Sequence, residues 1–137
     1  MAAPFSVRLS DATIAQLEAR ASGTSEAPRT VAQRYIEEGL RQDLHPLIRF
    51  ADGPAGRRAA LVGTGLDVWE VIATVRDNGG DITVAANYLA VAPALVDAAV
   101  TYYGSYRDEI DSMITAHERA VEVAHESWLA GRRAIRE

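Results

Sequence analysis

The chain has 137 residues, of which 48% are hydrophobic and 24% are charged, a balance typical of folded globular domains rather than of disordered chains. It contains no cysteine, which excludes disulfides, thiolate catalysis and cysteine-ligated zinc, and no apolar run approaches the ~20 residues that a membrane span needs. The net charge of −5 argues against a protein that coats nucleic acid generally, and a start without a signal-peptide core predicts a cytoplasmic protein.

The negative charge lies in the middle of the chain. Residues 42–111 hold five arginines and ten acidic residues, whereas residues 1–41 and 112–137 are each balanced. A DNA-binding role for the first segment is therefore compatible with the acidic whole.

The first predicted element is a short strand. Phe5, Val7 and Leu9 alternate with Ser6 and Arg8, so the two sets face opposite sides of an extended chain. A strand of five residues at the start of the chain has no neighbour close in sequence. It therefore needs a partner strand from elsewhere.

Two helices are predicted after this strand. Ser10 is a good N-cap, so the first helix should run from about Asp11 to Ser22 and end at Gly23. Pro28 suits the first turn of the second helix, which has an apolar face formed by Val31, Ala32, Tyr35, Ile36 and Leu40. Strand, helix and helix together are too small to bury a useful core alone.

This order, with FSVRLSDATIAQLEARA leading into PRTVAQRYIEEGLR, resembles the ribbon-helix-helix DNA-binding family, the family of CopG-like and VapB-like proteins. The resemblance implies that residues 1–43 form a DNA-binding and dimerisation domain. Two copies would pair their strands into a ribbon that enters the major groove. The plainer alternative is a capping strand plus a helical hairpin within some other small domain.

The same resemblance indicates which residues would meet DNA. The outward side of the ribbon would read base edges, and backbone amides at the start of the second helix would hold a phosphate. The candidates are Pro4, Ser6, Arg8, Arg29 and Thr30. Because only one arginine lies on the reading face, base specificity is expected to be modest.

Residues 44–111 predict a small hairpin followed by three helices. Apolar runs at 47–50 and 59–62 flank a turn cluster at 52–56, the pattern of a β-hairpin. The first helix should open at Asp67, where Glu70 completes a capping-box pattern. The second is expected from about Asp81 to Leu89 and the third from near Pro93.

The stretch from HPLIRF through DVWEVI to VDAAVTYYGSYRDEID is similar to a small bacterial domain family of homeodomain-like fold. That family usually occurs in antitoxins of the VapB type, encoded beside a PIN-like ribonuclease toxin. With the ribbon segment, the resemblance covers about residues 4–111. The third helix has no Arg, Lys, Asn or Gln, and Asp97 is its one charge, so it should not approach DNA. We interpret it as a degenerate helix-turn-helix used for packing, dimer contacts or partner binding.

Residues 112–137 predict a C-terminal helix and tail that bind a partner. Apolar or semi-apolar residues recur at alternating spacings of four and three, a heptad seam formed by Ile110, Ile114, His117, Val121, Ala124 and Trp128. The seam must pack on the body, on another subunit or on a different protein.

The antitoxin resemblance implies that this helix wraps a PIN-like toxin. We hypothesise that Trp128 anchors it and that Arg132 or Arg133 inserts among the carboxylates of the toxin, with Arg136 nearby. The alternative is a solvated tail whose arginines favour the C-terminal end of the helix dipole.

Other polar clusters have plainer interpretations. The acidic group Asp108, Glu109 and Asp111 is typical of a solvated helix start, and Glu118, Glu122 and His125 are expected on an exposed face rather than around a metal. The histidines His45, His117 and His125 have no nucleophile at diagnostic spacing. No enzymatic activity, catalytic residue, metal or cofactor is expected.

These predictions combine into one hypothesis. The fold should be mainly α, with an N-terminal ribbon-helix-helix, a hairpin and homeodomain-like helical module, and a long C-terminal helix. The protein would be a type II antitoxin, a homodimer or higher oligomer that binds double-stranded operator DNA in its own promoter and neutralises a PIN-like ribonuclease toxin. Two alternatives stay open: a stand-alone repressor that oligomerises through its C-terminal seam, and a protein-interaction module that binds no DNA.

Overall fold

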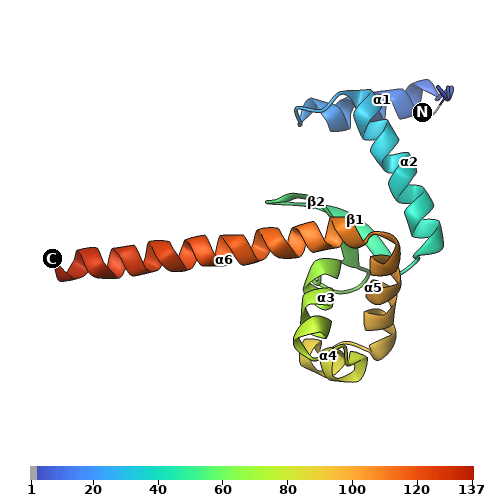
Figure 1. The fold of residues 1–137 in the computed structure, drawn as a ribbon. Coiled ribbons are helices and arrows are strands. Elements are labelled where there is room, and N and C mark those ends of the chain that lie inside the picture. Colours follow the sequence, from blue (N-terminus) through green and yellow to red (C-terminus); the bar gives the residue numbers. More distant parts are fainter. Residues whose placement is uncertain (1–2) are drawn as a thin grey trace. The chain divides into compact units, whose positions relative to one another are not determined.

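The computed structural model describes residues 3–137 and is mainly helical, with six helices and one two-stranded antiparallel sheet (Figure 1). The mainly α fold class is therefore confirmed. The chain divides into two compact units, Met1–Leu44 and His45–Glu137. The elements in chain order are α1 (Asp11–Ser22), α2 (Pro28–Leu44), β1 (Ile48–Gly53), β2 (Gly56–Leu61), α3 (Val68–Asp77), α4 (Ile82–Leu89), α5 (Pro93–Ser105) and α6 (Arg107–Arg136).

The N-terminal unit contains α1 and α2 and confirms both predicted helices. The hydroxyl of Ser10 accepts a hydrogen bond from the backbone N–H of Thr13 at 3.2 Å, which satisfies one amide in the first turn of α1. Gly23 ends the helix, and its N–H donates back to the carbonyl of Ala21. These local signals set the helix ends without help from tertiary contacts.

The predicted strand at Phe5–Leu9 is not a strand in the single chain. Residues 3–10 belong to no helix or strand. A strand is defined by hydrogen bonds to a second strand, and one copy of the chain supplies none here. The ribbon, which requires two copies, stays a prediction.

The predicted hairpin is confirmed, but its turn is tighter than expected. β1 and β2 pair antiparallel from Ile48 opposite Leu61 to Gly53 opposite Gly56, leaving a two-residue turn. The prediction of a turn over 52–56 is wrong in extent, because Asp52, Gly53 and Gly56 belong to the ladder. Gly56 has a φ of +110°, a conformation that side chains with a Cβ rarely adopt.

The three predicted helices after the hairpin also form. At α3, the side chain of Glu70 accepts a hydrogen bond from the backbone N–H of Asp67 at 3.2 Å, one half of the predicted capping box. At α4, the Asp81 carboxylate accepts from the N–H of Val84 at 3.0 Å. At α5, Pro93 lies in the first turn, where its missing N–H has no intrahelical partner to lose.

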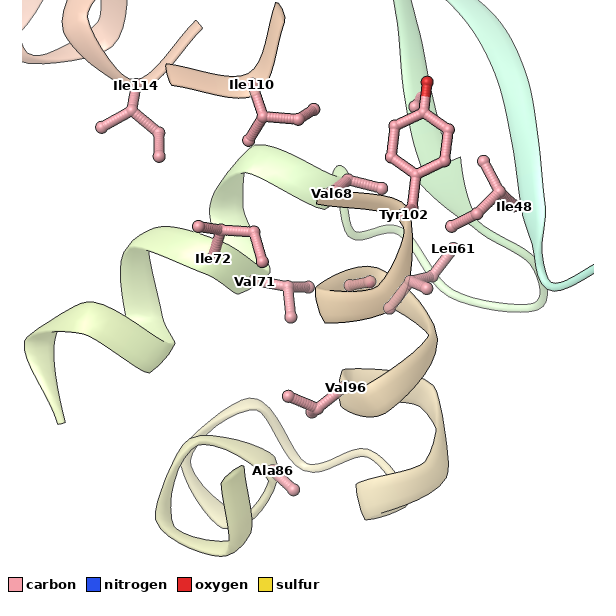
Figure 2. Packing of buried hydrophobic residues seen from close by; sticks show 12 residues of the cluster. Ile48, Leu61, Val68, Val71, Ile72, Ala86, Val96, Tyr102, Ile110 and Ile114 are labelled. Carbon is pink, nitrogen blue, oxygen red and sulfur yellow. The ribbon is translucent and has the colours of Figure 1, made fainter. Parts of the chain in front are cut away.

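The core of the second unit lies between the hairpin, α3, α4, α5 and the start of α6 (Figure 2). Tyr102 on α5 and Ile110 on α6 have no exposed surface, and Ile48 and Leu61 face them from the two strands. α5 contributes Val96, Ala99 and Tyr102 to this cluster, so it is a core helix. Packing is one of the three roles that we interpret for the third helix, and that it does not read DNA stays a prediction.

No single helix within residues 3–137 is both long and apolar enough to cross a membrane. α4 and α5 pass the same test of length and composition only as a pair, bent by 115°.

Candidate functional site

The first candidate surface is the segment that precedes α1. Phe5 is 90% exposed and Val7 53% exposed, and Pro4, Ser6 and Arg8 are exposed as well. Two apolar side chains in open solvent forfeit about 1.5–3 kcal/mol each compared with burial. The alternation that predicts a ribbon is thus present in the structure. Its apolar side chains are not covered by the rest of the chain, and its polar side chains are accessible.

This segment is joined firmly to α1. Ser10 has extended backbone angles, φ −65° and ψ 156°, while its side chain caps the helix. The Ser10 and Thr13 hydroxyl oxygens also lie 2.9 Å apart, within hydrogen-bond distance. The cap therefore fixes the direction in which the extended residues leave the helix.

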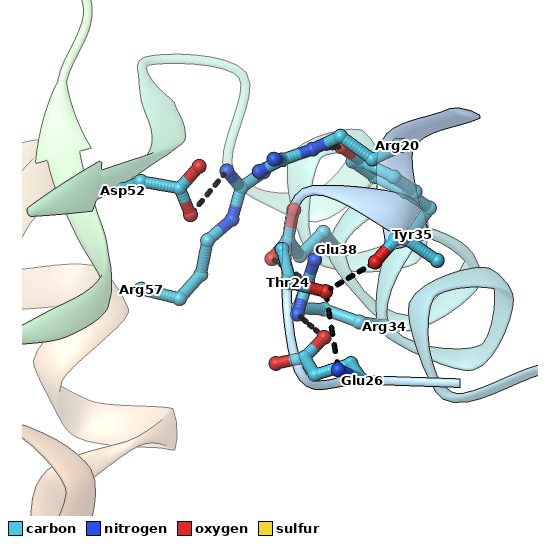
Figure 3. Close-up of polar contacts among 9 residues, drawn as sticks. Arg20, Thr24, Glu26, Arg34, Tyr35, Glu38, Asp52 and Arg57 are labelled. Atoms are coloured by element: carbon cyan, nitrogen blue, oxygen red, sulfur yellow. Dashed lines mark hydrogen bonds and ion pairs between the residues drawn. The ribbon is translucent and has the colours of Figure 1, made fainter. Parts of the chain in front are cut away.

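The second candidate surface is the start of α2, where Arg29 and Thr30 are exposed in the first turn. The preceding turn is held by polar contacts (Figure 3). The hydroxyl of Thr24 donates to the carbonyl of Ala21 and accepts from the N–H of Glu26, and Glu26 forms an ion pair with Arg34 on α2. These contacts order the loop that presents the first turn of α2.

α1 and α2 contact each other through both polar and apolar side chains. The guanidinium of Arg20 donates to the hydroxyl of Tyr35 at 3.1 Å (Figure 3). Ala21 and Val31 are the apolar residues buried in the described part of this unit. Larger apolar residues stay exposed around them, namely Ile14, Ile36, Leu40 and Leu44. A surface of this kind usually marks an interaction site.

The third candidate surface is the outer part of α6. Ile110 and Ile114 are buried, but every residue from Thr115 to Glu137 is exposed, and Figure 1 shows the helix continuing past the rest of its unit. The predicted seam is therefore covered only at its start. The body of the second unit buries its first two positions, and the other four are exposed.

Trp128 is 57% exposed on this part of α6 and is held between its neighbours on the helix. The His125 ring stacks on the indole with 5.9 Å between centroids, and the Arg132 guanidinium carbon lies 5.4 Å from the centroid on the next turn. Of the predicted partner-binding residues, the structure thus brings Trp128 and Arg132 together. Arg133 and Arg136 are exposed on the same helix.

Two members of the acidic group at the start of α6, Glu109 and Asp111, contact residues of their own unit, and the third, Asp108, is exposed. Asp111 accepts a hydrogen bond from the Tyr103 hydroxyl at 2.7 Å and pairs with Arg76 on α3. The Tyr103 hydrogen bond, followed by Arg76, lowers the pKa of Asp111 below its ordinary value. Glu109 accepts from the Tyr102 hydroxyl at 2.9 Å. Residues 3–137 hold no group of three or more His, Cys, Asp or Glu side chains placed to bind a metal.

A second polar cluster, around Asp67 and Arg58, was not predicted from the sequence. Asp67 accepts from the Arg58 guanidinium at 2.7 Å and from the Trp69 indole at 3.2 Å, and the same guanidinium donates to the carbonyl of Asp52 at 2.6 Å. This network ties the hairpin to the start of α3. The contact between Arg58 and Asp67 spans nine residues of irregular and strand structure, and no local sequence signal marks it.

Comparisons with known proteins give one distant likeness. No family model matches the chain, and no curated protein matches it. A crystal structure of a DUF433 member protein from Anabaena variabilis ATCC 29413 is similar to it at 25% sequence identity and a TM-score of 0.43. The match covers 78% of this chain and 99% of that chain.

Proposed function

We propose that this chain is a type II antitoxin. Two copies would join their N-terminal segments into a ribbon that binds operator DNA in its own promoter. The C-terminal half would bind and silence a PIN-like ribonuclease. The proposal combines the sequence resemblance with the distribution of exposed apolar surface over the two units.

One observation carries the DNA-binding half of the proposal. Phe5 and Val7 are exposed in a single copy, and they alternate with exposed Ser6 and Arg8 in a segment that the Ser10 cap joins to α1. Pairing with a second copy would cover the apolar side and leave Arg8 outward. Arginine is the side chain best suited to a bidentate contact with guanine in the major groove.

The partner-binding half rests on α6. An exposed tryptophan flanked by a stacked histidine and an arginine is the kind of group that anchors protein interfaces. A PIN-like ribonuclease holds its metal with several carboxylates, and an arginine placed among them would pair with those acids. Arg132 and Arg133 are the candidates for that contact.

A stand-alone repressor is the second candidate function. It would use the same ribbon, and the exposed part of α6 would meet another copy of the chain instead of a toxin. The exposed heptad positions on α6 favour this alternative as much as they favour a ribonuclease partner.

DNA binding is tested with Arg8→Ala on the DNA immediately upstream of the gene. Two Arg8 side chains per dimer, each worth about 1–3 kcal/mol, should make the loss of affinity at least tenfold. Arg119→Ala is the matched control, because it removes an equal charge from an exposed position on α6. Equal effects of the two variants in a gel-shift titration would reject base reading by Arg8.

Toxin binding is tested by co-expressing the product of the adjacent gene and measuring its affinity for the full chain and for a chain lacking residues 127–137. We expect the truncated chain to lose inhibition of the ribonuclease while keeping DNA binding. Unchanged affinity would discard Trp128 and Arg132 as contacts.

A further inference from the structure

The exposed half of α6, residues 115–137, continues the heptad seam beyond the six positions noted in the sequence. Extending the alternation of three and four adds Gly131 and Ile135, and Ile135 is 83% exposed. The exposed stripe is then formed by His117, Val121, Ala124, Trp128, Gly131 and Ile135. From His117 to Ile135 it is about 27 Å long, at 1.5 Å per residue.

The charge of this half of α6 is polarised along its length. Residues 115–126 hold three glutamates and one arginine, whereas residues 127–137 hold three arginines and one glutamate. A second copy placed parallel would set like charges against each other. A second copy placed antiparallel would set each acidic stretch against a basic one, which is favourable at both ends.

The sizes of the stripe residues match in the antiparallel arrangement. When the two helices cross at Glu126, Trp128 lies opposite Ala124 of the second copy, and Val121 lies opposite Gly131. Each large side chain meets a small one. The flanking positions on one side of the stripe, Ala120, Ser127 and Ala134, are also small and permit close approach of the two helices.

Gly131 is otherwise hard to explain. Glycine inside a helix costs about 1 kcal/mol relative to alanine. A Cβ added at Gly131 would meet no atom within 4 Å, so the single chain gives no steric reason for its absence. A notch that receives Val121 of a second copy supplies that reason.

The ends of the stripe are matched as well. His117 packs on Trp69 of α3, with 4.7 Å between ring centroids, where α6 leaves the rest of its unit. In the same register, Ile135 of the second copy would lie against His117. Glu118 and Arg132, which flank the stripe on its other side, would be brought to the same edge of the pair.

From these observations we infer that two copies of the chain pair through the exposed halves of α6, antiparallel and centred on Glu126. The pairing covers Trp128, Val121 and Ile135 and places Glu118 of each copy near Arg132 of the other. This inference goes beyond the proposed function and does not rest on it, since its test uses the chain alone. A ribonuclease that binds Trp128 and Arg132 would compete with the second copy for the same face of α6.

The register is tested by crosslinking the full chain. The protein has no cysteine, so each introduced thiol is unique. Ser127 lies beside the two-fold axis, and Ser127→Cys should crosslink to itself through a short bismaleimide. Ala120 lies about 18 Å along the axis from Ala120 of the second copy. Ala120→Cys should therefore not crosslink to itself, but a mixture of Ala120→Cys and Ala134→Cys chains should.

The outcomes separate the arrangements. Self-crosslinking of all three variants to the same extent would indicate parallel pairing, and absence of a Ser127→Cys crosslink would indicate no pairing at α6. Either result overturns the inference. A ribbon formed by the N-terminal segments alone would also leave Ser127→Cys uncrosslinked.

A charge exchange tests the pairing without changing its apolar residues. In the Ser127→Cys background, Glu118→Arg should lower the crosslinked fraction several-fold, because it faces Arg132 of the second copy. Adding Arg132→Glu should restore that fraction. Glu122→Arg, which changes the charge equally on the outer face of the helix, should have a smaller effect. Failure of the double variant to recover would reject the proposed contact.

Discussion

The two units of this chain differ in how far each completes its own core. In His45–Glu137, large side chains such as Tyr102, Leu61 and Ile110 are fully buried. In the described part of Met1–Leu44, the buried apolar residues are Ala21 and Val31, while Phe5 and Leu40 are exposed. The second unit has the burial that an independent domain needs, and the first leaves most of its large apolar side chains uncovered by its own residues.

α6 contains the same contrast within one helix. Its first turns complete a core, whereas its other half carries the same three-four repeat and is exposed to solvent from Thr115 to Glu137. The repeat alone therefore does not distinguish a core helix from an interface helix. Solvent exposure in the folded chain makes that distinction.

The largest expected effect concerns the core of the second unit. Tyr102→Ala should lower the free energy of unfolding by about 3–5 kcal/mol, because it leaves a large cavity and removes the hydroxyl that donates to Glu109. Denaturant unfolding measures the change. Tyr88→Ala is the control, since Tyr88 is 78% exposed and its substitution should change the free energy of unfolding little. Similar losses in both variants would contradict the assigned core.

The next effect addresses the incomplete N-terminal unit. If a second copy buries Phe5, Phe5→Ser should weaken the dimer by about 1.5–3 kcal/mol per chain, measured by sedimentation across a range of protein concentrations. Val84→Ser, at an exposed apolar residue of α4, should leave the association unchanged. If Phe5→Ser left the dimer dissociation constant unchanged, the proposed ribbon would be rejected.

A smaller effect is expected where the hairpin joins α3. Asp67→Ala should lower the free energy of unfolding by about 1–3 kcal/mol, because it leaves Arg58 and the Trp69 indole without this acceptor. Asp81→Ala removes only a helix cap and should cost about 1 kcal/mol. An equal loss in the two variants, measured by denaturant unfolding, would mean that the Arg58 contact contributes nothing.

The smallest effect is a pH dependence at the junction of α3, α5 and α6. The Tyr103 hydrogen bond and Arg76 lower the pKa of Asp111 below its ordinary value of 3.8. The stabilisation from these contacts is therefore complete above pH 3.8 and is lost as the pH falls through the lower pKa of the folded state. Asp111→Asn should reduce the acid sensitivity of unfolding below pH 3.8. An unchanged acid profile would show that this carboxylate does not contribute.

The helix ends were predictable because their signals are local. Ser10, Gly23, Asp67, Asp81 and Pro93 each act on backbone groups within a few residues, and the helices begin or end where these residues predict. The hairpin was predictable for the same reason. The predicted turn was too long, because Gly53 and Gly56 on either side of the actual turn pair with each other in the ladder. The sequence does not reveal this pairing.

The candidate surfaces were predictable in part. The sequence marks Phe5, Arg8 and Trp128 as residues that need or suit a partner, and all three are exposed in the structure. The polar clusters were not predictable. Arg76 meets Asp111 across 35 residues and Tyr103 across 27, and only the packing of α3 against α5 and α6 brings them together.

By itself, the sequence determined where helices and turns form, because capping and turn geometry act between residues a few positions apart. The tertiary structure decided that α6 packs through Ile110 and Ile114 and is exposed from Thr115 onward. The apolar repeat continues unchanged through that point. A turn of the helix is buried only where another element packs against it. α6 continues past the rest of its unit (Figure 1), so its outer turns are exposed.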